Sequence, residues 1–262
     1  MRTLVMGVLN VTPDSFSDGG RWLDAKAAIR QARRMVRDGA HLIDVGGEST
    51  RPGAKAVPLK EELRRILPVV DALAKEGIRV SIDTSKAGVA AAALAAGATM
   101  VNDVTALRGD RAMAGVCARA GAEVVLMHMK GSPQTMQRAP SYKDLIAEIS
   151  GFFRKRLRFA LRAGIARDKI FLDPGIGFGK RPEHNMQILR RLKDFAALGH
   201  PLVVGTSRKS FIGGILGGRP SSDRVFGTAA TVAAAVLRGA AVVRVHDVRE
   251  MSDVVRVTDE LR

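Results

Sequence analysis

Eight short apolar segments recur along this chain of 262 residues, and each is followed by polar residues that could bind a ligand or take part in catalysis. Asn10 ends the first segment, Asp83 the third and Asp173 the sixth. A helical stretch follows every segment, and a glycine follows seven of these stretches, as is common where helices end. Strands and helices that alternate in this way are typical of a parallel sheet, in which all strands run in one direction.

We expect the eight units to close into a single (β/α)8 TIM barrel over residues 1–262, an ordinary length for this fold. In such a barrel the C-terminal ends of all strands surround one mouth, where the active site lies. Residues far apart in the sequence would therefore converge on one pocket, which favours an enzyme. An open doubly wound sheet is the competing architecture, but eight units in one uninterrupted series favour closure.

The expected elements can be placed by residue number. The apolar segments predict strands at 4–9, 42–45, 80–82, 100–101, 124–127, 170–172, 201–204 and 242–243. The stretches between them predict helices at 24–38, 59–76, 86–96, 111–120, 142–163, 183–198, 222–238 and 247–261. Three connections after strands are longer than a turn requires, at 10–23, 46–58 and 128–141. We expect these loops to build part of the active site.

The chain carries a formal net charge of +16, which raises the alternative of a basic nucleic-acid-binding protein. Its arginines are spread over nearly all expected helices, aromatic residues make up only 4%, and no nucleic-acid-binding motif is present. We therefore expect solvated helix faces, no nucleic-acid partner and a diffuse positive field that collects small anionic substrates.

The expected location is the cytoplasm. The apolar stretches are too short to predict a membrane span, and no secretory signal precedes the first expected strand. Cys117 is the single cysteine, which excludes an internal disulfide and fits a reducing compartment. We expect its thiol to be buried and structural.

Two long motifs give the chain a family resemblance. Residues 6–20, MGVLNVTPDSFSDGG, and residues 43–53, IDVGGESTRPG, resemble the two signatures of dihydropteroate synthases. The resemblance continues, in the order of the family, through 81–86, 102–103, 126–129, 172–180, 207–210 and 244–247. It implies a TIM barrel and a transferase of folate biosynthesis. The implied reaction joins 6-hydroxymethyl-7,8-dihydropterin diphosphate to p-aminobenzoate, which gives 7,8-dihydropteroate and releases diphosphate.

The resemblance implies a pterin site whose residues suit the ligand on chemical grounds. Asp173 would accept two hydrogen bonds from adjacent N–H groups of the pterin, a pairing that suits a carboxylate. Asn102 would contact a neighbouring donor and acceptor, Asp83 would face the N8 side, and Lys209 would reach the ring carbonyl and N5. For the two aspartates the alternative is a helix N-cap, which is common directly after a strand. The implied pterin set is Asp83, Asn102, Met127, Asp173, Phe178 and Lys209.

The resemblance also implies a diphosphate site at the ends of the first and last strands, which are neighbours in a closed barrel. Asn10 would be a direct ligand of Mg²⁺, the expected cofactor, because this ion prefers oxygen ligands and is held by few protein groups. Arg244 would bridge phosphate oxygens with its guanidinium. The implied diphosphate set is Asn10, Arg51, Arg244 and His246. The implied catalytic set is Asp18, Asp83, Lys209, Arg244 and His246.

The second substrate, p-aminobenzoate, is expected where the first two long loops meet. Thr50 and Arg51 offer polar groups to an anion there, and two further side chains would enclose the aromatic ring. The implied set is Phe16, Thr50, Arg51, Pro52 and Ser210. Sulfonamides are planar anilines with an acidic para group, so they are expected to compete for this site. The resemblance also implies a homodimer.

Two related functions compete with this interpretation. A methyltetrahydrofolate-binding methyltransferase would share the pterin-binding carboxylates, but it would not need the diphosphate residues or the stretch 207–210. A pterin-binding protein without activity is the second alternative, but no matched position of the motifs has been lost. The full set of motifs favours a dihydropteroate synthase.

Overall fold

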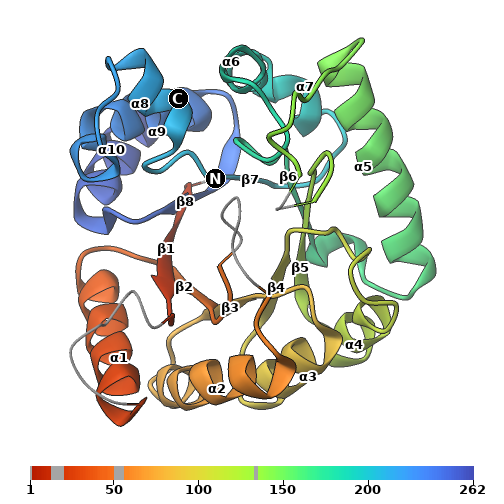
Figure 1. Cartoon of the computed structure of the whole chain (residues 1–262), viewed down its shortest axis with the longest axis vertical. Helices are drawn as coiled ribbons and strands as arrows, with labels where there is room; N and C mark the ends of the chain where they lie inside the picture. The colour runs from red at the N-terminus through yellow and green to blue at the C-terminus, as the bar shows by residue number, and fades with distance from the viewer. Residues whose placement is uncertain (1, 13–20, 50–55, 133–134) are drawn as a thin grey trace.

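A ring of parallel strands forms the centre of this computed structural model (Figure 1). The structure describes residues 2–12, 21–49, 56–132 and 135–262, except the side chains of 21–24. The strands are β1 (Leu4–Asn10), β2 (Leu42–Gly46), β3 (Val80–Asp83), β4 (Met100–Asp103), β5 (Glu123–Met127), β6 (Ile170–Asp173), β7 (Leu202–Val204) and β8 (Ala240–Val245). They pair in chain order, and β8 pairs with β1. The expected closed TIM barrel is therefore confirmed.

The helices lie around the outside of the ring (Figure 1). They are α1 (Arg21–Arg37), α2 (Leu59–Lys75), α3 (Ala87–Ala95), α4 (Met113–Ala120), α5 (Leu145–Arg162), α6 (Pro182–Arg190), α7 (Leu192–Ala196), α8 (Ser210–Ile215), α9 (Val225–Leu237) and α10 (Val248–Glu260). Two 3-10 turns are η2 (Arg167–Lys169) and η3 (Ser221–Asp223). Apolar side chains of the strands and helices pack together, and burial of this surface is the main stabilising contribution to the fold. Cys117 is buried in this layer, as expected.

The inside of the barrel changes from apolar to polar along the strands. A separate apolar cluster consists of Met6, Leu42, Met100, Val125, Phe171, Val203 and Val242. Side chains two residues apart in a strand point to the same face of the sheet. That step leads from Leu42 to Asp44, from Met100 to Asn102, from Phe171 to Asp173 and from Val242 to Arg244. The strand ends therefore place carboxylates, an amide and a guanidinium directly above an apolar floor.

The glycines predicted to end helices do so. All seven have a positive φ, which other residues adopt only at a cost. They are Gly39, Gly77, Gly97, Gly121, Gly164, Gly199 and Gly239. The start of α5 is later than predicted, because Oδ1 of Asp144 accepts hydrogen bonds from the N–H groups of Ile146 and Ala147 at 3.1 and 3.0 Å. Asp144 is thus an N-cap.

Two expectations about helices are wrong in detail. The helix predicted at 183–198 is divided into α6 and α7, because the backbone at Arg191 departs from helical geometry with φ −107° and ψ 22°. The short α8 was not expected, since Gly213 and Gly214 lower the helix propensity of its sequence. In the described part of the chain, no helix combines the length and the apolar character needed to cross a membrane.

Candidate active site

A pocket opens at the C-terminal ends of the strands, where a TIM barrel places its active site. It contains about 470 Å³ of space, part of which is open to solvent. The described residues that line it are Asp83, Asn102, Val104, Met127, Asp173, Gly175, Ile176, Phe178, Gly205, Ser207, Lys209, Arg244 and His246. All six side chains predicted to bind a pterin are among them, together with two of those predicted to bind diphosphate. The barrel thus brings together residues that are far apart in the sequence.

Arg244 joins two carboxylates at this pocket. Its Nη2 donates to Oδ2 of Asp83 at 2.9 Å, and its Nε donates to Oδ2 of Asp44 at 2.6 Å. Burial alone would lower the pKa of Arg244, but Asp44 and Asp83 favour the charged guanidinium, and the net shift of this pKa is upward. Burial is the main cause that raises the pKa of Asp83 to about 7. The positive charge of Arg244 opposes this rise, and the negative charge of Asp44 adds to it. Asp83 is therefore near the midpoint of its titration at neutral pH.

Asp173 and Lys209 supply a second pair of charged groups. Oδ1 of Asp173 accepts from the N–H of Gly175 at 2.6 Å. Nζ of Lys209 donates to the carbonyl of Ile176 at 2.5 Å and lies 4.3 Å from the centre of the Phe178 ring. Burial raises the pKa of Asp173 and lowers that of Lys209 to about 8. An acceptor and a cation beside an aromatic ring suit a flat heterocycle that carries N–H and carbonyl groups.

The helix-cap interpretation of the two aspartates is wrong. The residues at the N-cap positions of α3 and α6 are Lys86 and Arg181, so neither Asp83 nor Asp173 caps the helix after its strand. Oδ1 of Asp83 is also buried without a hydrogen-bond partner among the described residues. Buried acceptors are usually satisfied, so this oxygen is suited to a ligand N–H.

A buried lysine fixes the loop that carries Phe178. Nζ of Lys180 lies 3.0 Å from Nδ1 of His128, 3.1 Å from the His128 carbonyl and 2.9 Å from the Phe178 carbonyl. These acceptors match the donors that a lysine side chain offers. Burial lowers the pKa of His128 to about 2, with Lys180 adding to the shift, so the imidazole is neutral. His128 had no predicted role; the structure shows that it supports one wall of the pocket.

The loops after β7 and β8 are tied to each other. Oγ of Ser207 accepts from the N–H of His246 at 3.1 Å and lies 3.0 Å from its Nδ1. Arg208 donates to Asp247 through Nε at 3.0 Å and through Nη2 at 2.5 Å.

Asn10, at the end of β1, is half-buried and is not among the residues that line the described pocket. The predicted metal ligand therefore lies at the mouth rather than in the pterin pocket.

Most residues predicted for the second substrate, and one predicted catalytic residue, lie outside the described residues. These are Phe16, Asp18, Thr50, Arg51 and Pro52. Ser210 is described: it is the exposed first residue of α8 and lines an adjoining pocket instead of the pterin pocket. Gly177 and Lys180 also line that second pocket, so the two pockets meet at the loop around Phe178.

Comparison with known proteins agrees with this geometry. The family model described as pterin binding enzyme matches residues 6–246 of the chain. The dihydropteroate synthase of Synechocystis sp. is 51% identical over 261 residues, which cover 99% of this chain and 90% of that protein. The chain belongs to the dihydropteroate synthase family.

Solved dihydropteroate synthases have the same fold as this family member. The Yersinia pestis dihydropteroate synthase, in complex with a sulfonamide drug, has a TM-score of 0.94 and 45% identity, covering 100% of this chain and 94% of that chain. The Xanthomonas albilineans dihydropteroate synthase, solved with 4-aminobenzoic acid, has a TM-score of 0.93 and 44% identity, covering 99% of this chain and 93% of that chain. Dihydropteroate synthases are transferases, so the chain is an enzyme of that class.

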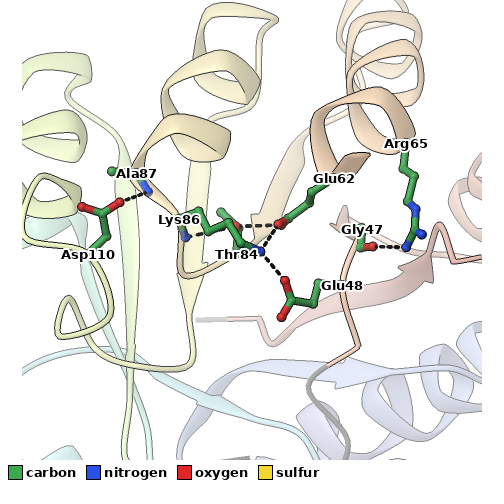
Figure 2. A network of polar contacts seen from close by, with 8 residues as sticks. All are labelled: Gly47, Glu48, Glu62, Arg65, Thr84, Lys86, Ala87 and Asp110. Atoms are coloured by element: carbon green, nitrogen blue, oxygen red, sulfur yellow. Dashed lines mark hydrogen bonds and ion pairs between the residues drawn. The ribbon is translucent and has the colours of Figure 1, made fainter. Parts of the chain in front are cut away.

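In this member of the dihydropteroate synthase family, an ion-pair network holds the chain where it leaves β2 (Figure 2). Lys86 binds Glu48, just after β2, and the fully buried Glu62 of α2, the latter at 2.5 Å. Nη1 of Arg65 donates to the carbonyl of Gly47 at 2.8 Å. The predicted second-substrate loop therefore starts from a fixed stem. The sequence did not indicate these contacts, because they depend on how α2 packs beside the ends of β2 and β3.

Asp44 is the other important residue that sequence reasoning missed. It lies inside the second motif of the family resemblance, but no role was assigned to it. The alternation of the strand could have indicated it, since Leu42 points into the barrel and Asp44 is two residues further along. A carboxylate at an inward strand position must find polar partners, and Asp44 finds them in Asn102 and Arg244.

Proposed function

We propose that this chain condenses 6-hydroxymethyl-7,8-dihydropterin diphosphate with p-aminobenzoate to give 7,8-dihydropteroate and diphosphate. The observation that carries the proposal is one pocket that combines Asp173, Asn102 and Lys209 with Arg244 and His246. A carboxylate and an amide match the N–H groups of a pterin, whereas a guanidinium and an imidazole match a diphosphate. Both halves of the first substrate therefore have partners in the same place.

The pterin would pack against the apolar part of the pocket wall and form hydrogen bonds with the polar part of the wall. Met127 is buried with Val104, and Phe178 packs beside this cluster, so a flat ring finds apolar contacts. The free oxygen of Asp173 is available to the ring N–H groups, since its Oδ1 already accepts from the backbone. Lys209 would exchange its hydrogen bond with the Ile176 carbonyl for one with the pterin carbonyl.

Diphosphate departs first in the mechanism that we propose. The bond between the exocyclic methylene carbon and the diphosphate oxygen breaks, and its electron pair leaves with the oxygen. Arg244 and His246 would stabilise the departing anion, and the carboxylate of Asp83 would stabilise the positive charge that spreads into the pterin ring. The amine nitrogen of p-aminobenzoate then bonds to the methylene carbon and loses a proton to solvent. This order suits an aniline, which is a weak nucleophile.

Mg²⁺ is the proposed cofactor. No group of three or more His, Cys, Asp or Glu side chains among the described residues is arranged to hold a metal. Mg²⁺ does not need such a group, because it is usually bound by substrate phosphates and water together with few protein ligands. The half-buried carboxamide of Asn10, at the end of β1, would supply one such oxygen. When bound, the ion would neutralise part of the diphosphate charge.

The second substrate is proposed to bind beside the pterin, where Ser210 lines the adjoining pocket. Phe16, Thr50, Arg51 and Pro52 are proposed to complete this site from the two N-terminal loops. The Xanthomonas albilineans relative was solved with 4-aminobenzoic acid and the Yersinia pestis relative with a sulfonamide drug. We propose that both ligand types compete for one site in this chain as well.

A homodimer in the cytoplasm is the proposed state of the enzyme. Large apolar side chains are exposed on the last three helices of the chain, including Phe226 at 83% and Val257 at 64%. Single exposed apolar residues are common, but several on neighbouring helices favour an interface. The single buried cysteine and the absence of any disulfide support a reducing location.

Incubation of the purified chain with pterin diphosphate, p-aminobenzoate and Mg²⁺ tests the proposal. The expected products are 7,8-dihydropteroate and diphosphate in equal amounts. An Asp173→Asn variant should lose most of this activity, whereas Asp168→Asn, in the distant η2 turn, should keep it. Methyl transfer from methyltetrahydrofolate without dihydropteroate formation would favour the methyltransferase alternative.

A further inference from the structure

A buried carboxylate lies beneath the pterin pocket without lining it. Asp44 belongs to β2 and is fully buried. In the parallel pairing of β2 with β3, Gly46 is opposite Asp83 and Asp44 is opposite Ser81. Asp44 is therefore one inward layer below the carboxylate of the pocket, and it must act on a ligand through other side chains.

One oxygen of Asp44 holds two residues of the pocket. Its Oδ2 accepts from Nδ2 of Asn102 at 3.0 Å and from Nε of Arg244 at 2.6 Å. An ionised carboxylate can only accept, so it fixes which end of the Asn102 amide points toward it. Nδ2 faces Asp44, and Oδ1 remains as the acceptor that Asn102 offers elsewhere in the pocket. Without this contact, the two ends of the amide could exchange places.

Asp44 also gives Arg244 a partner that does not touch the ligand. Nη2 of the same guanidinium binds Asp83, which we propose to interact with the pterin. When Asp83 turns toward a ligand or takes up a proton, Asp44 still anchors Arg244 in the barrel. The charged groups that act on Asp83 are Arg244 from β8, Asp44 from β2, Glu62 from α2, Asp103 from β4 and Lys209 from the loop after β7.

We propose that Asp44 is a positioning residue that orients Asn102 and Arg244 for the pterin substrate. The inference rests on the proposed pterin site. It gives Asp44 two separable properties. Its position directs the amide of Asn102, and its negative charge competes with Asp83 for Arg244.

The first test is calorimetric binding of 6-hydroxymethyl-7,8-dihydropterin to the whole enzyme. Asp44→Asn should weaken this affinity by about tenfold or more, because the amide places a donor beside groups that need an acceptor. The Michaelis constant for p-aminobenzoate should change less than twofold. Ser81→Ala is the matched control, since Ser81 is fully buried opposite Asp44 and its hydroxyl has no hydrogen-bond partner among the described residues. It should leave both values unchanged.

A second variant separates position from charge. Asp44→Glu keeps the negative charge but moves the carboxylate by one methylene group, so pterin affinity should fall while its pH dependence stays in place. The negative charge of Asp44 raises the pKa of Asp83, so Asp44→Asn should lower that pKa and leave Asp83 as the remaining carboxylate partner of Arg244. The pH midpoint of pterin binding should then move to lower pH. A residue with a merely structural role would not move this midpoint. Each variant has its own expected result, so the inference is still tested if one of the two variants does not fold.

Asn102→Ala distinguishes a failure of this inference from a failure of the pterin site. If Asn102→Ala weakens pterin binding but folded Asp44→Asn binds with wild-type affinity, Asp44 does not position the site. If Asn102→Ala has no effect either, the proposed pterin site itself is wrong. Equal losses for pterin and p-aminobenzoate in Asp44→Asn would also overturn the inference, because they would indicate a general distortion of the barrel.

Discussion

Pterin binding should release a proton from Asp83. Burial raises the pKa of this carboxyl group to about 7 in the unliganded pocket, although Arg244 opposes the shift. A bound pterin brings N–H donors to the carboxylate and favours its charged form. The pKa should therefore fall well below 7 in the complex, and a proton that Asp83 carries before binding must leave.

The size of this effect follows from the pKa of the free pocket. With a pKa of about 7, Asp83 is about 90% protonated at pH 6, about half protonated at pH 7 and about 10% protonated at pH 8. Those fractions are the protons released per site when the bound form is fully ionised. Pterin affinity should accordingly fall by about fivefold from pH 7 to pH 6 and by nearly tenfold for each further unit that the pH drops.

The measurement is isothermal titration calorimetry in two buffers that differ in ionisation enthalpy, at pH 6, 7 and 8. A pterin without diphosphate is the ligand, so that phosphate groups do not titrate. The dependence of the observed enthalpy on the buffer gives the number of protons released. Asp83→Asn is the control: its affinity should be lower at pH 8 but nearly independent of pH. No buffer dependence at pH 6 in the wild-type chain, or the same dependence in the variant, would refute the assignment to Asp83.

Four further predictions test other parts of the site. Asp173→Asn should weaken pterin binding by a factor of about ten to a hundred while the melting temperature stays within a few degrees, since a charge-assisted hydrogen bond is replaced by opposed donors; calorimetry and thermal unfolding check this. Lys86→Met should lower the free energy of unfolding by about 3 kcal/mol in urea denaturation, because Glu62 is buried beside it, whereas Lys75→Met breaks only an exposed pair and should change it by less than about 0.5 kcal/mol. Asn10→Ala should weaken Mg²⁺-dependent diphosphate binding but not the binding of a pterin without diphosphate, and equal losses in calorimetry would contradict its role as a metal ligand. Phe226→Asp should convert a dimer to a monomer in analytical ultracentrifugation, since it puts a charge on a side chain that is 83% exposed; an unchanged sedimentation coefficient would place the interface elsewhere.

The barrel could be predicted from the sequence because its units repeat. Apolar segments identified all eight strands, and helix-ending glycines marked seven of the connections. The residues at the strand ends followed directly, since parallel strands that close into a barrel bring Asp83, Asn102 and Asp173 to one side. The sequence did not predict the division of a helix at Arg191 or the short, glycine-containing α8, because tertiary packing decides both.

The contacts that support the site were harder to predict than the site itself. Lys180 meets His128 because the loops after β5 and β6 approach each other, and no local pattern indicates which side chains will touch there. The same holds for Lys86 and Glu62, which come from different elements (Figure 2). Asp44 is intermediate, since its inward direction follows from strand alternation but its partners follow only from the closed barrel.

The charges of the pocket and of the whole chain have opposite signs, and each sign suits one part of the reaction. Two buried carboxylates, Asp83 and Asp173, lie at the pocket with two cations, Arg244 and Lys209. The buried carboxylate of Asp44 beneath them gives this group of five side chains a net negative charge when all are ionised. In the proposed mechanism, a pterin that gains positive charge as diphosphate leaves would be stabilised there. The chain as a whole carries +16, which attracts the diphosphate and the aminobenzoate carboxylate from solution. High salt should therefore slow the capture of both substrates while leaving the buried charges, and the chemical step that depends on them, much less affected.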